Sequence, residues 1–449
     1  MEKLSSQKSG LAADSIVIGF ALFAIYFGAG NLIFPPHLGV RTGHLWLLSF
    51  VCYFITDMGL SIVAIIAAAR FNADVKLLTS PIGRKAALIL CTANIICLGP
   101  ALAIPRTAAT TFELGIVPLT SIGVDNTLAR AVFSCIFFTV VFLLTIRPNK
   151  VVDIVGKILT PVLLVSLIIL IAQGLISPRG VVMDPISTDI IRDGFYNGYQ
   201  TLDLMGSMFF AVIIVNAAKD KGYTTKRSYL RITCISSVLA AALLFLIYAG
   251  RCYLGASTGT QWIWQVADGT MNQAGLLIAI ISSLLGRPGM LLLAIVVTFA
   301  CLTTAIGLTS ATSEYFYETS HGRIRQIWSI TAICILSAVV CNLGLSKIIS
   351  LSAPILLLLY PLTVLLVLLS FLRKKVRNRM AYILSSAVTL IMSILECLGT
   401  NFGFSGLLSF TQSIPLAEYG FCWLLPAAAA FMIGMFIPCR SKVDPPDED

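Results

Sequence analysis

Long apolar runs separated by short polar segments extend along nearly the whole chain, and most are long enough to cross a bilayer as a helix. The stretch from Trp262 to Leu285 is more interrupted, and we predict an outer loop with a short helical hairpin there. If it crossed the membrane, there would be one more span. About twelve membrane helices are predicted, at 14–34, 46–69, 86–112, 130–146, 151–176, 197–218, 229–250, 289–316, 325–344, 348–372, 380–400 and 420–438.

The first apolar run is interrupted in its middle. After Ser15–Phe27 the chain reads Gly28-Ala29-Gly30-Asn31, and Pro35-Pro36 follow soon afterwards. Two glycines and an asparagine at bilayer depth favour local unwinding, which leaves backbone N–H and C=O groups without helical partners. Each such group costs several kcal/mol in hydrocarbon unless protein, a cavity or a ligand satisfies it. We therefore predict unwinding at Gly28–Asn31 and the end of this helix at Pro35.

Internal symmetry is predicted from the spacing of the runs. Residues 14–176 and 197–372 each contain five predicted helices, so the two halves would have opposite orientations in the membrane. The second half also opens on a polar, glycine-containing segment, Asn197–Ser207. Glycines can simply let helices pack closely, but paired interruptions at corresponding positions point to a transporter binding site. The predicted fold is an all-α integral membrane protein with a five-plus-five inverted repeat and two peripheral helices at 380–438.

Composition agrees with a membrane protein. The 449 residues are 57% hydrophobic and only 12% charged, against about 25% charged residues in a soluble domain. Most of the twelve cysteines lie inside apolar runs, and we find no CxxC pair or metal-ligand spacing. His37, His44 and His321 fall in predicted loops. Gly156-Lys157 lacks the remainder of a P-loop, so ATP-driven transport is not expected.

The net charge of +10 reflects topology and does not indicate nucleic-acid binding. Most of the 31 Lys and Arg residues fall in alternate segments, beginning with the N-terminus. The positive-inside rule then places both tails, 1–13 and 439–449, in the cytoplasm. Few basic residues fall in the predicted outer segments: Arg41, Arg130, Arg179, Arg192, Arg251, Arg287 and Lys347.

Four segments together resemble a known family. They are FALFAIYFGAGNLIFPPHLG at 20–39, GPALAIPRTA at 99–108, GYQTLD at 198–203 and CLTTAIGLTS at 301–310. They are similar to motifs of the bacterial branched-chain amino acid:cation symporter family, and the resemblance covers the whole chain. It implies the five-plus-five, leucine-transporter-type fold, and import of Leu, Ile and Val driven by a Na⁺ or H⁺ gradient. No cofactor is implied beyond this coupling ion.

An amino acid zwitterion suits the two predicted breaks. Free N–H groups and the positive dipole end at the first break suit a carboxylate, and free carbonyls at the second suit an ammonium. A branched aliphatic tail needs an apolar pocket, for which Ile104, Met205 and Phe209 are candidates. The substrate-binding residues we predict are Gly28, Ala29, Gly30, Asn31, Asp203, Gly206 and Ser207.

Adjacent hydroxyls in the eighth helix suggest a cation site. By the resemblance, Thr303 and Thr304 would join the carbonyls of Ala24 and Phe27 to bind Na⁺. The alternative is that each hydroxyl returns to a carbonyl of its own helix, as is common in membrane helices.

Four ionisable residues fall deep within predicted helices, where each needs a polar partner or an aqueous cavity. Asp203 is the strongest functional candidate, near the substrate ammonium or as a proton carrier, although it could only cap the broken helix. Arg106 could hold a gate closed or form a structural ion pair. Asp57 and Glu396 are interpreted as structural.

The sequence thus predicts a symporter of the bacterial inner membrane that works by alternating access and is not an enzyme. Its partners would be a small amino acid, a monovalent cation and the lipid bilayer. A carrier of another neutral amino acid, such as alanine or serine, stays possible, as does a facilitator or channel. A membrane-embedded lipid-modifying enzyme would need clustered acids or histidines at the membrane surface, and none stands out. The choice between Na⁺ and H⁺, the preference among Leu, Ile and Val, and the oligomeric state are left open.

Overall fold

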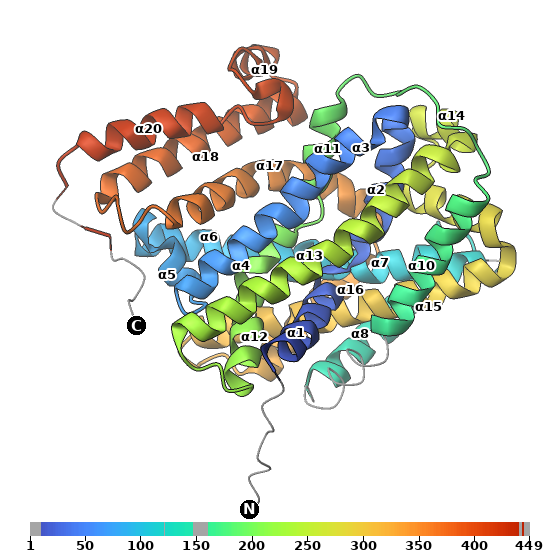
Figure 1. The fold of residues 1–449 in the computed structure, drawn as a ribbon, viewed down its shortest axis with the longest axis horizontal. Helices are drawn as coiled ribbons and strands as arrows, with labels where there is room; N and C mark the ends of the chain where they lie inside the picture. The colour runs from blue at the N-terminus through green and yellow to red at the C-terminus, as the bar shows by residue number, and fades with distance from the viewer. Residues whose placement is uncertain (1–9, 121, 147–159, 440–441, 444–449) are drawn as a thin grey trace, which may run out of the picture.

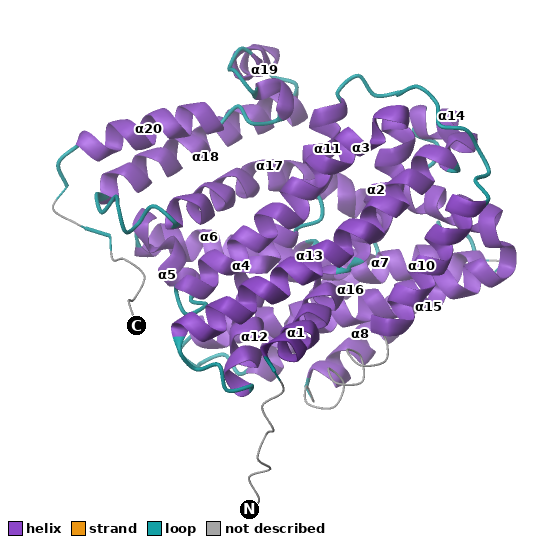
Figure 2. Cartoon of the chain, viewed as in Figure 1, coloured by secondary structure: helices purple, strands orange, loops and turns teal. Residues whose placement is uncertain are grey.

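The molecule is a bundle of long apolar helices, as the hydropathy pattern predicts. The computed structural model describes residues 10–120, 122–146, 160–439 and 442–443. Within these ranges, eight helices are long and apolar enough to cross a membrane, and four shorter apolar helices accompany them. Apart from one isolated bridge, Asn378 with Lys442, the described secondary structure is helical (Figure 2). The chain is therefore an all-helical, multi-pass membrane protein.

The first predicted helix is broken, as expected, but over a shorter stretch. Helix α1 (Leu11–Tyr26) ends at Phe27, and α2 (Ala29–Thr42) begins immediately after an extended Gly28. Unwinding is thus confined to Phe27–Gly28, and Ala29–Asn31 form the first turn of α2. The prediction that the helix ends at Pro35 is wrong, since α2 continues through Pro35 and Pro36. For the same reason His37 lies in a helix and not in a loop.

The second broken helix consists of α11 (Ile190–Tyr199) and α12 (Asp203–Asp220). It begins seven residues earlier than predicted, because Ile190–Asn197 are helical despite their polar composition. Between the two parts, Leu202 has a left-handed backbone with φ 72°, which ends the α-helical ladder. Glycine is the usual residue in that conformation, so a leucine there marks a backbone held in place by its surroundings.

Two other membrane helices contain irregular turns. The second comprises α3 (Trp46–Phe54), the π-helical turn η2 (Ile55–Gly59) and α4 (Leu60–Arg70). The third runs from α6 (Arg84–Ile96) through η4 (Cys97–Ala101) to α7 (Ala103–Thr111) and η5 (Phe112–Ile116). In η4, Gly99 is non-helical beside Pro100. Such π-turns are frequent at functional sites.

The described ends of the remaining helices agree with the predicted spans within about four residues, except that α13 (Lys226–Ser257) continues beyond the predicted end at 250. These helices include α8 (Thr127–Thr145), α10 (Thr160–Ile176), α13, α16 (Gln326–Cys341), α17 (Leu345–Ser370), α18 (Arg379–Phe402) and α20 (Leu424–Phe436). The start predicted at 151, Gly156-Lys157 and most of the two tails lie outside the described residues.

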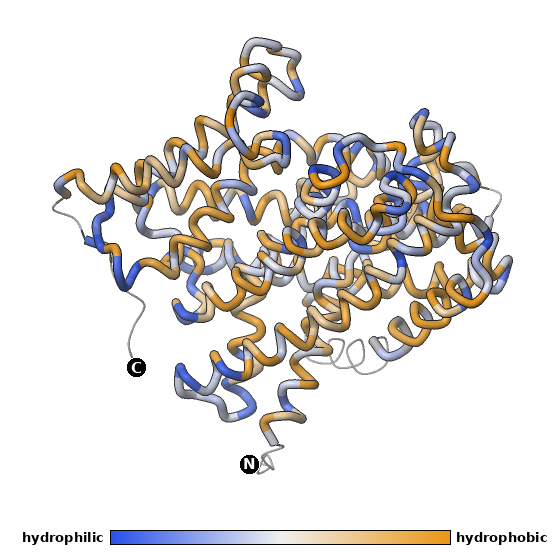
Figure 3. The backbone as a smooth tube through the Cα atoms, turned by 45° about the horizontal axis from the view of Figure 1, so that its top comes forward, coloured by the Kyte–Doolittle hydropathy of each residue, from blue (hydrophilic) through white to orange (hydrophobic). Residues whose placement is uncertain are grey.

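The interrupted stretch Trp262–Leu285 is helical. The turn η8 (Gly259–Trp262) and the short α14 (Ile263–Ala267) lead into α15 (Gln273–Thr319), which bends at Gly286, where φ is 58°. The predicted helical hairpin is present, but its second arm joins the following membrane helix with only this bend between them. Short polar turns separate the hydrophobic helices along the tube in Figure 3.

The broken helices each pack against a different long neighbour. Both α1 and α2 contact α13, whereas α11 contacts α3 and α12 contacts α4. A second group forms around α15, which contacts α7, α8 and α16. At the edge of the molecule, α18 packs on α20 and reaches the rest through α17 (Figure 1). The outer faces are apolar, with Ile176, Leu128 and Phe436 each more than three-quarters exposed, as expected for surfaces that face lipid.

Candidate functional site

The two breaks meet around a small cavity in the centre of the bundle. Its polar wall includes Gly28, Gly30 and Asn31 from the first broken helix, and Thr201 and Asp203 from the second. Its volume is about 30 Å³, enough for about two water molecules. A branched-chain amino acid would therefore need this site to widen. Apolar side chains complete the wall: Ile25, Leu98, Ala103, Leu202, Phe210 and Leu308.

The first break releases backbone groups toward this cavity. The Gly28 N–H donates to the Tyr26 carbonyl at 2.7 Å, so the Ala24 carbonyl loses the donor that a continuous helix would supply. Downstream, Ala29 and Gly30 open α2, and the first N–H groups of a helix have no intrahelical acceptor. The N-terminus of α2 therefore presents free donors and a positive dipole end to the cavity, which favours an anion.

Arg106 stabilises the second break. Its Nη1 donates to the Gln200 carbonyl at 2.6 Å, and its Nη2 donates to the Thr201 carbonyl at 3.0 Å. Both carbonyls stand where α11 ends, so the guanidinium replaces donors that the helix no longer provides. Arg106 is thus a link between α7 and the broken helix, with no ion pair to a carboxylate within 4.0 Å among the described residues.

The same guanidinium lies directly over the first break. A Cβ atom added at Gly30 would lie 2.9 Å from Arg106 Nη2, and the Phe34 ring centroid is 5.9 Å from the guanidinium carbon. The side chain of Arg106 is buried, and its Nε has no partner among the described atoms. One guanidinium therefore holds the second break, lies beside the first turn of α2, and keeps an unpartnered Nε.

Asn31 connects the two broken helices. Its Nδ2 donates to Asp203 Oδ2 at 2.6 Å and to the Tyr26 carbonyl at 2.6 Å. Asp203 is the first residue of α12, where the helix dipole favours a negative charge. The Tyr26 hydroxyl and Ser207 Oγ are 2.7 Å apart. The predicted Ser207 thus binds Tyr26, while the other six predicted substrate residues line the cavity: Gly28, Ala29, Gly30, Asn31, Asp203 and Gly206.

The apolar candidates are placed differently from the prediction. Phe209 contacts Tyr315 and lines a different cleft, and the adjacent Phe210 lines the central cavity. Ile104 and Met205 are buried away from its wall. Phe209 and Phe210 point about 100° apart around α12. Which of the two faces the cavity depends on where the neighbouring helices lie, and the sequence alone does not give that.

Sequence reasoning missed Arg251, which we assigned to an outer segment. It lies in α13, is 1% exposed, and donates through Nη1 to the Asn31 carbonyl at 3.0 Å and through Nη2 to the Leu32 carbonyl. Pro35 and Pro36 have no N–H groups, so these two carbonyls lack their usual donors four residues ahead. Arg251 supplies both hydrogen bonds, which explains why α2 continues through the prolines. The Pro-Pro pair was the sequence feature that could have predicted an outside donor for these carbonyls.

The paired threonines of α15 bond to their own helix, as the alternative interpretation held. Thr303 Oγ1 and Thr304 Oγ1 donate to the Ala300 carbonyl at 2.9 and 3.0 Å. They differ in what they face. A Cβ atom added at Gly28 would lie 3.4 Å from Thr304 Oγ1, and Thr304 lines the central cavity. Thr304 is therefore the threonine that lies beside the break.

The acids interpreted as structural lie in different surroundings. Glu396 is buried in α18, does not line the central cavity, and accepts a hydrogen bond from Cys422 Sγ at 3.2 Å. Asp57, in η2, is completely buried and accepts from Thr201 Oγ1 at 2.8 Å. Asp57 thus belongs to the central site.

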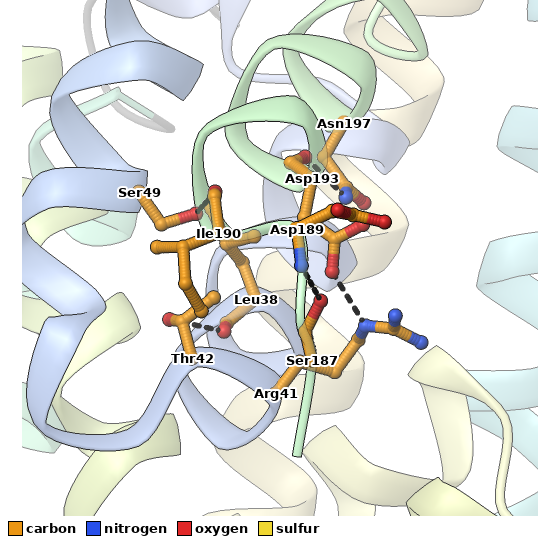
Figure 4. A network of polar contacts seen from close by, with 9 residues as sticks. All are labelled: Leu38, Arg41, Thr42, Ser49, Ser187, Asp189, Ile190, Asp193 and Asn197. Carbon is orange, nitrogen blue, oxygen red and sulfur yellow. Dashed lines mark hydrogen bonds and ion pairs between the residues drawn. The ribbon is translucent and has the colours of Figure 1, made fainter. Parts of the chain in front are cut away.

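One end of the broken helices is held by a polar network (Figure 4). Arg41 Nε of α2 donates to Asp193 Oδ2 of α11 at 3.0 Å, and Ser49 Oγ of α3 donates to the Ile190 carbonyl at 2.9 Å. The preceding connection is also attached, since the Ile186 and Ser187 N–H groups donate to the Arg41 carbonyl. These contacts join α2, α3 and α11 to one another.

The opposite end is open. A cleft of about 440 Å³ lies between the segment 72–76, α12 and the end of α15. It has Phe209 on α12, and Glu314 and Glu318 on α15. Since Phe210 and Leu308 line the central cavity on the same two helices, the cleft approaches that cavity to within about one helical turn.

Comparison with known proteins decides the family. The sequence matches the family described as "Branched-chain amino acid transport protein" over residues 11–441. The chain belongs to this family. It is 36% identical over 428 residues to the branched-chain amino acid permease BrnQ of Escherichia coli K12, covering 94% of this chain and 95% of that protein. It is also 36% identical to the branched-chain amino acid permease BraB of Bacillus subtilis, covering 94% of each. The family and its relatives are transporters and not enzymes, and the chain is a multi-pass membrane permease.

Solved structures support the fold. Mhp1, a nucleobase-cation-symport-1 family transporter, superposes with a TM-score of 0.60 at 10% identity, covering 94% of this chain and 92% of that one. A manganese transporter of Eremococcus coleocola gives 0.57 at 14% identity, covering 97% of each. The likeness concerns architecture, a leucine-transporter-like helical bundle.

Proposed function

We propose that this permease is a secondary symporter that imports Leu, Ile and Val across the bacterial inner membrane by alternating access. The observation that carries the proposal is the meeting of two broken helices around one cavity, with Arg106 and Asp203 in its wall. Relatives with about one-third of residues identical are named branched-chain amino acid permeases, which supports this substrate class.

The proposed pose places the substrate carboxylate at the N-terminus of α2. There the free N–H groups of Ala29 and Gly30 and the Nε of Arg106 supply donors, and charge-assisted bonds of this type are the strong ones. The ammonium faces Asp203. The branched tail contacts the apolar wall, in which Leu98, Phe210 and Leu308 are prominent. A polar side chain would have fewer hydrogen-bonding partners at this apolar wall.

Na⁺ is the coupling ion that the threonine geometry favours. The Ala24 carbonyl lacks its helical donor at the first break, and the Thr304 hydroxyl lies beside Gly28. Hydroxyl and carbonyl oxygens suit a small hard cation. Both threonines donate to the Ala300 carbonyl, which leaves the lone pairs of their hydroxyl oxygens available to a cation. Binding the cation would order the break and so favour substrate, and substrate would favour the cation equally.

An inverted repeat explains the packing pattern. If residues 14–176 and 197–372 are two copies of one fold, the first membrane helix corresponds to the sixth and the second to the seventh. Each contact between two helices should then have a counterpart between the two corresponding helices. The contact of α1–α2 with α13 becomes that of α11–α12 with α3–α4, and both are present. Likewise α10 contacts α1, α13 and α15, whereas α17 contacts α12, α4 and α7. This reciprocity supports a five-plus-five repeat.

Alternating access is supported by the unequal ends of the bundle. A polar network that includes Arg41 and Asp193 holds one end, and the end lined by Lys76 and Glu318 has a cleft. The positive-inside count assigns the cleft, and both termini, to the cytoplasm. We infer a state closed to the outside with a contracted site, from which α1–α2 and α11–α12 would move relative to α7 and α15.

Transport into liposomes tests this function. Purified protein would be reconstituted, radiolabelled leucine added outside, and inward gradients of Na⁺ and of H⁺ imposed in separate experiments. Accumulation above the outside concentration under either gradient supports symport, and the effective gradient names the ion. Equilibration without accumulation would indicate a facilitator. Excess unlabelled isoleucine and valine should compete, while alanine and serine should compete weakly.

A further inference from the structure

Two carboxyl side chains lie in contact beside the central cavity. Asp57 comes from the π-helical turn η2 of the second helix, and Asp203 comes from the first turn of α12. Their side chains are within hydrogen-bonding reach of each other. Asp57 is completely buried, while Asp203 lines the cavity. Two ionised carboxylates in contact repel each other, and a buried pair of this kind keeps a proton on one member.

The acceptor oxygens around Asp57 outnumber the hydrogens that can be donated to them. Thr201 Oγ1 lies 2.8 Å from Asp57 Oδ1 and also 2.7 Å from the Gly198 carbonyl, yet a hydroxyl has a single proton to donate. Asp57 Oδ2 is buried and has no donor among the described residues. A proton on Asp57 Oδ2 gives that oxygen a hydrogen bond to donate to Asp203, while Oδ1 stays an acceptor for Thr201.

Asp203 has the surroundings of the charged partner. It accepts a 2.6 Å hydrogen bond from Asn31 Nδ2 and begins a helix, where the dipole favours an anion. Arg106 acts electrostatically on Asp203 from α7. Arg251, in α13, donates two hydrogen bonds to carbonyls of α2, so it does not pair with Asp57. The other titratable neighbours that face Asp57 are the hydroxyls of Tyr26, Tyr53, Tyr248 and Tyr360.

We propose that Asp57 is a proton-binding positioning residue: it keeps a proton that it donates to Asp203, which leaves one negative charge facing the substrate ammonium. This inference rests on the proposed transport function. When the pH rises far enough, the Asp57 proton leaves to water and a second negative charge appears beside the first. The repulsion then separates η2 from the second break, so substrate binding is present at lower pH and is lost as the pH rises.

Asparagine is the matched replacement, since its amide can donate to Asp203 but cannot titrate. Leucine uptake would be measured against external pH, at fixed Na⁺, for wild-type protein, Asp57→Asn and Asp57→Ala in liposomes. The buried carboxylic-acid C=O band would be recorded by infrared spectroscopy on the same proteins. Glu396→Gln is the control, because it removes a buried acid that does not line the central cavity.

Asp57→Asn should lose the alkaline decline in leucine uptake and remove one carboxylic-acid band. Asp57→Ala, which leaves Asp203 without this donor, should weaken leucine binding about 10- to 100-fold. Glu396→Gln should leave the pH profile unchanged. The proposal is overturned if wild-type uptake declines at alkaline pH and Asp57→Asn declines identically, or if Asp57→Asn leaves the infrared spectrum intact. Absence of uptake by wild-type protein would instead count against the transport function. The infrared spectra would still show whether Asp57 carries a proton.

Discussion

Replacing Arg106 by lysine tests the central link between the two breaks. Arg106 donates to the Gln200 and Thr201 carbonyls, and in the proposed pose its unpartnered Nε binds the substrate carboxylate. A lysine ammonium keeps the charge but lacks the planar fork, so it cannot hold both carbonyls and also bind the carboxylate. Losing one hydrogen bond to a charged group costs about 1.5–3 kcal/mol, which predicts about 10- to 150-fold weaker leucine binding.

The assay is leucine binding and uptake by Arg106→Lys, with Arg130→Lys as the matched control. Arg130 is also buried and also donates to two backbone carbonyls, those of Asn342 and Val124, but it lies between α8 and α16. The control should change protein abundance without changing leucine affinity. If Arg106→Lys is abundant and binds leucine within about two-fold of wild type, the role assigned to Arg106 is wrong.

Three further predictions follow from individual contacts. Thr304→Val should raise the Na⁺ concentration needed for half-maximal uptake by about ten-fold, and Thr303→Val should do less, because Thr304 lies nearer Gly28; equal effects in a Na⁺ titration would contradict this. Gly39→Ala should reduce folded protein, since its Cβ would overlap the Cys252 carbonyl of α13, whereas Gly307→Ala meets no atom within 4 Å; comparable thermal stability of the two variants would refute the packing. Arg251→Lys should lower the melting temperature by leaving a carbonyl of α2 without a donor; an unchanged melting curve would argue against that support.

The sequence was sufficient for the class of fold and for the existence of both breaks. Hydropathy determines which segments cross the membrane, and Gly28, Gly30 and Asn31 mark a helix that cannot continue unaided in lipid. Their residue types also suit an amino acid zwitterion. Six of the seven predicted substrate residues line the central cavity, and Ser207 instead donates its hydroxyl to the Asp203 carbonyl and contacts Tyr26.

Long-range contacts account for what the sequence did not disclose. Pro35 would end most helices, but Arg251, more than two hundred residues away, supplies the missing donors. The contact of Asp57 with Thr201 depends on a π-turn that shifts its side chain, and no local pattern announces such a turn. Local propensity predicts where a chain is under strain, and the partner that relieves the strain is set by tertiary packing.

An experimental structure with leucine and Na⁺ bound would test the central claim most directly. We expect leucine between the two breaks, with its carboxylate within hydrogen-bonding distance of the Gly30 N–H and Arg106, and its ammonium facing Asp203. Leucine bound away from both breaks, or a first helix that becomes continuous through Phe27 and Gly28, would contradict the account.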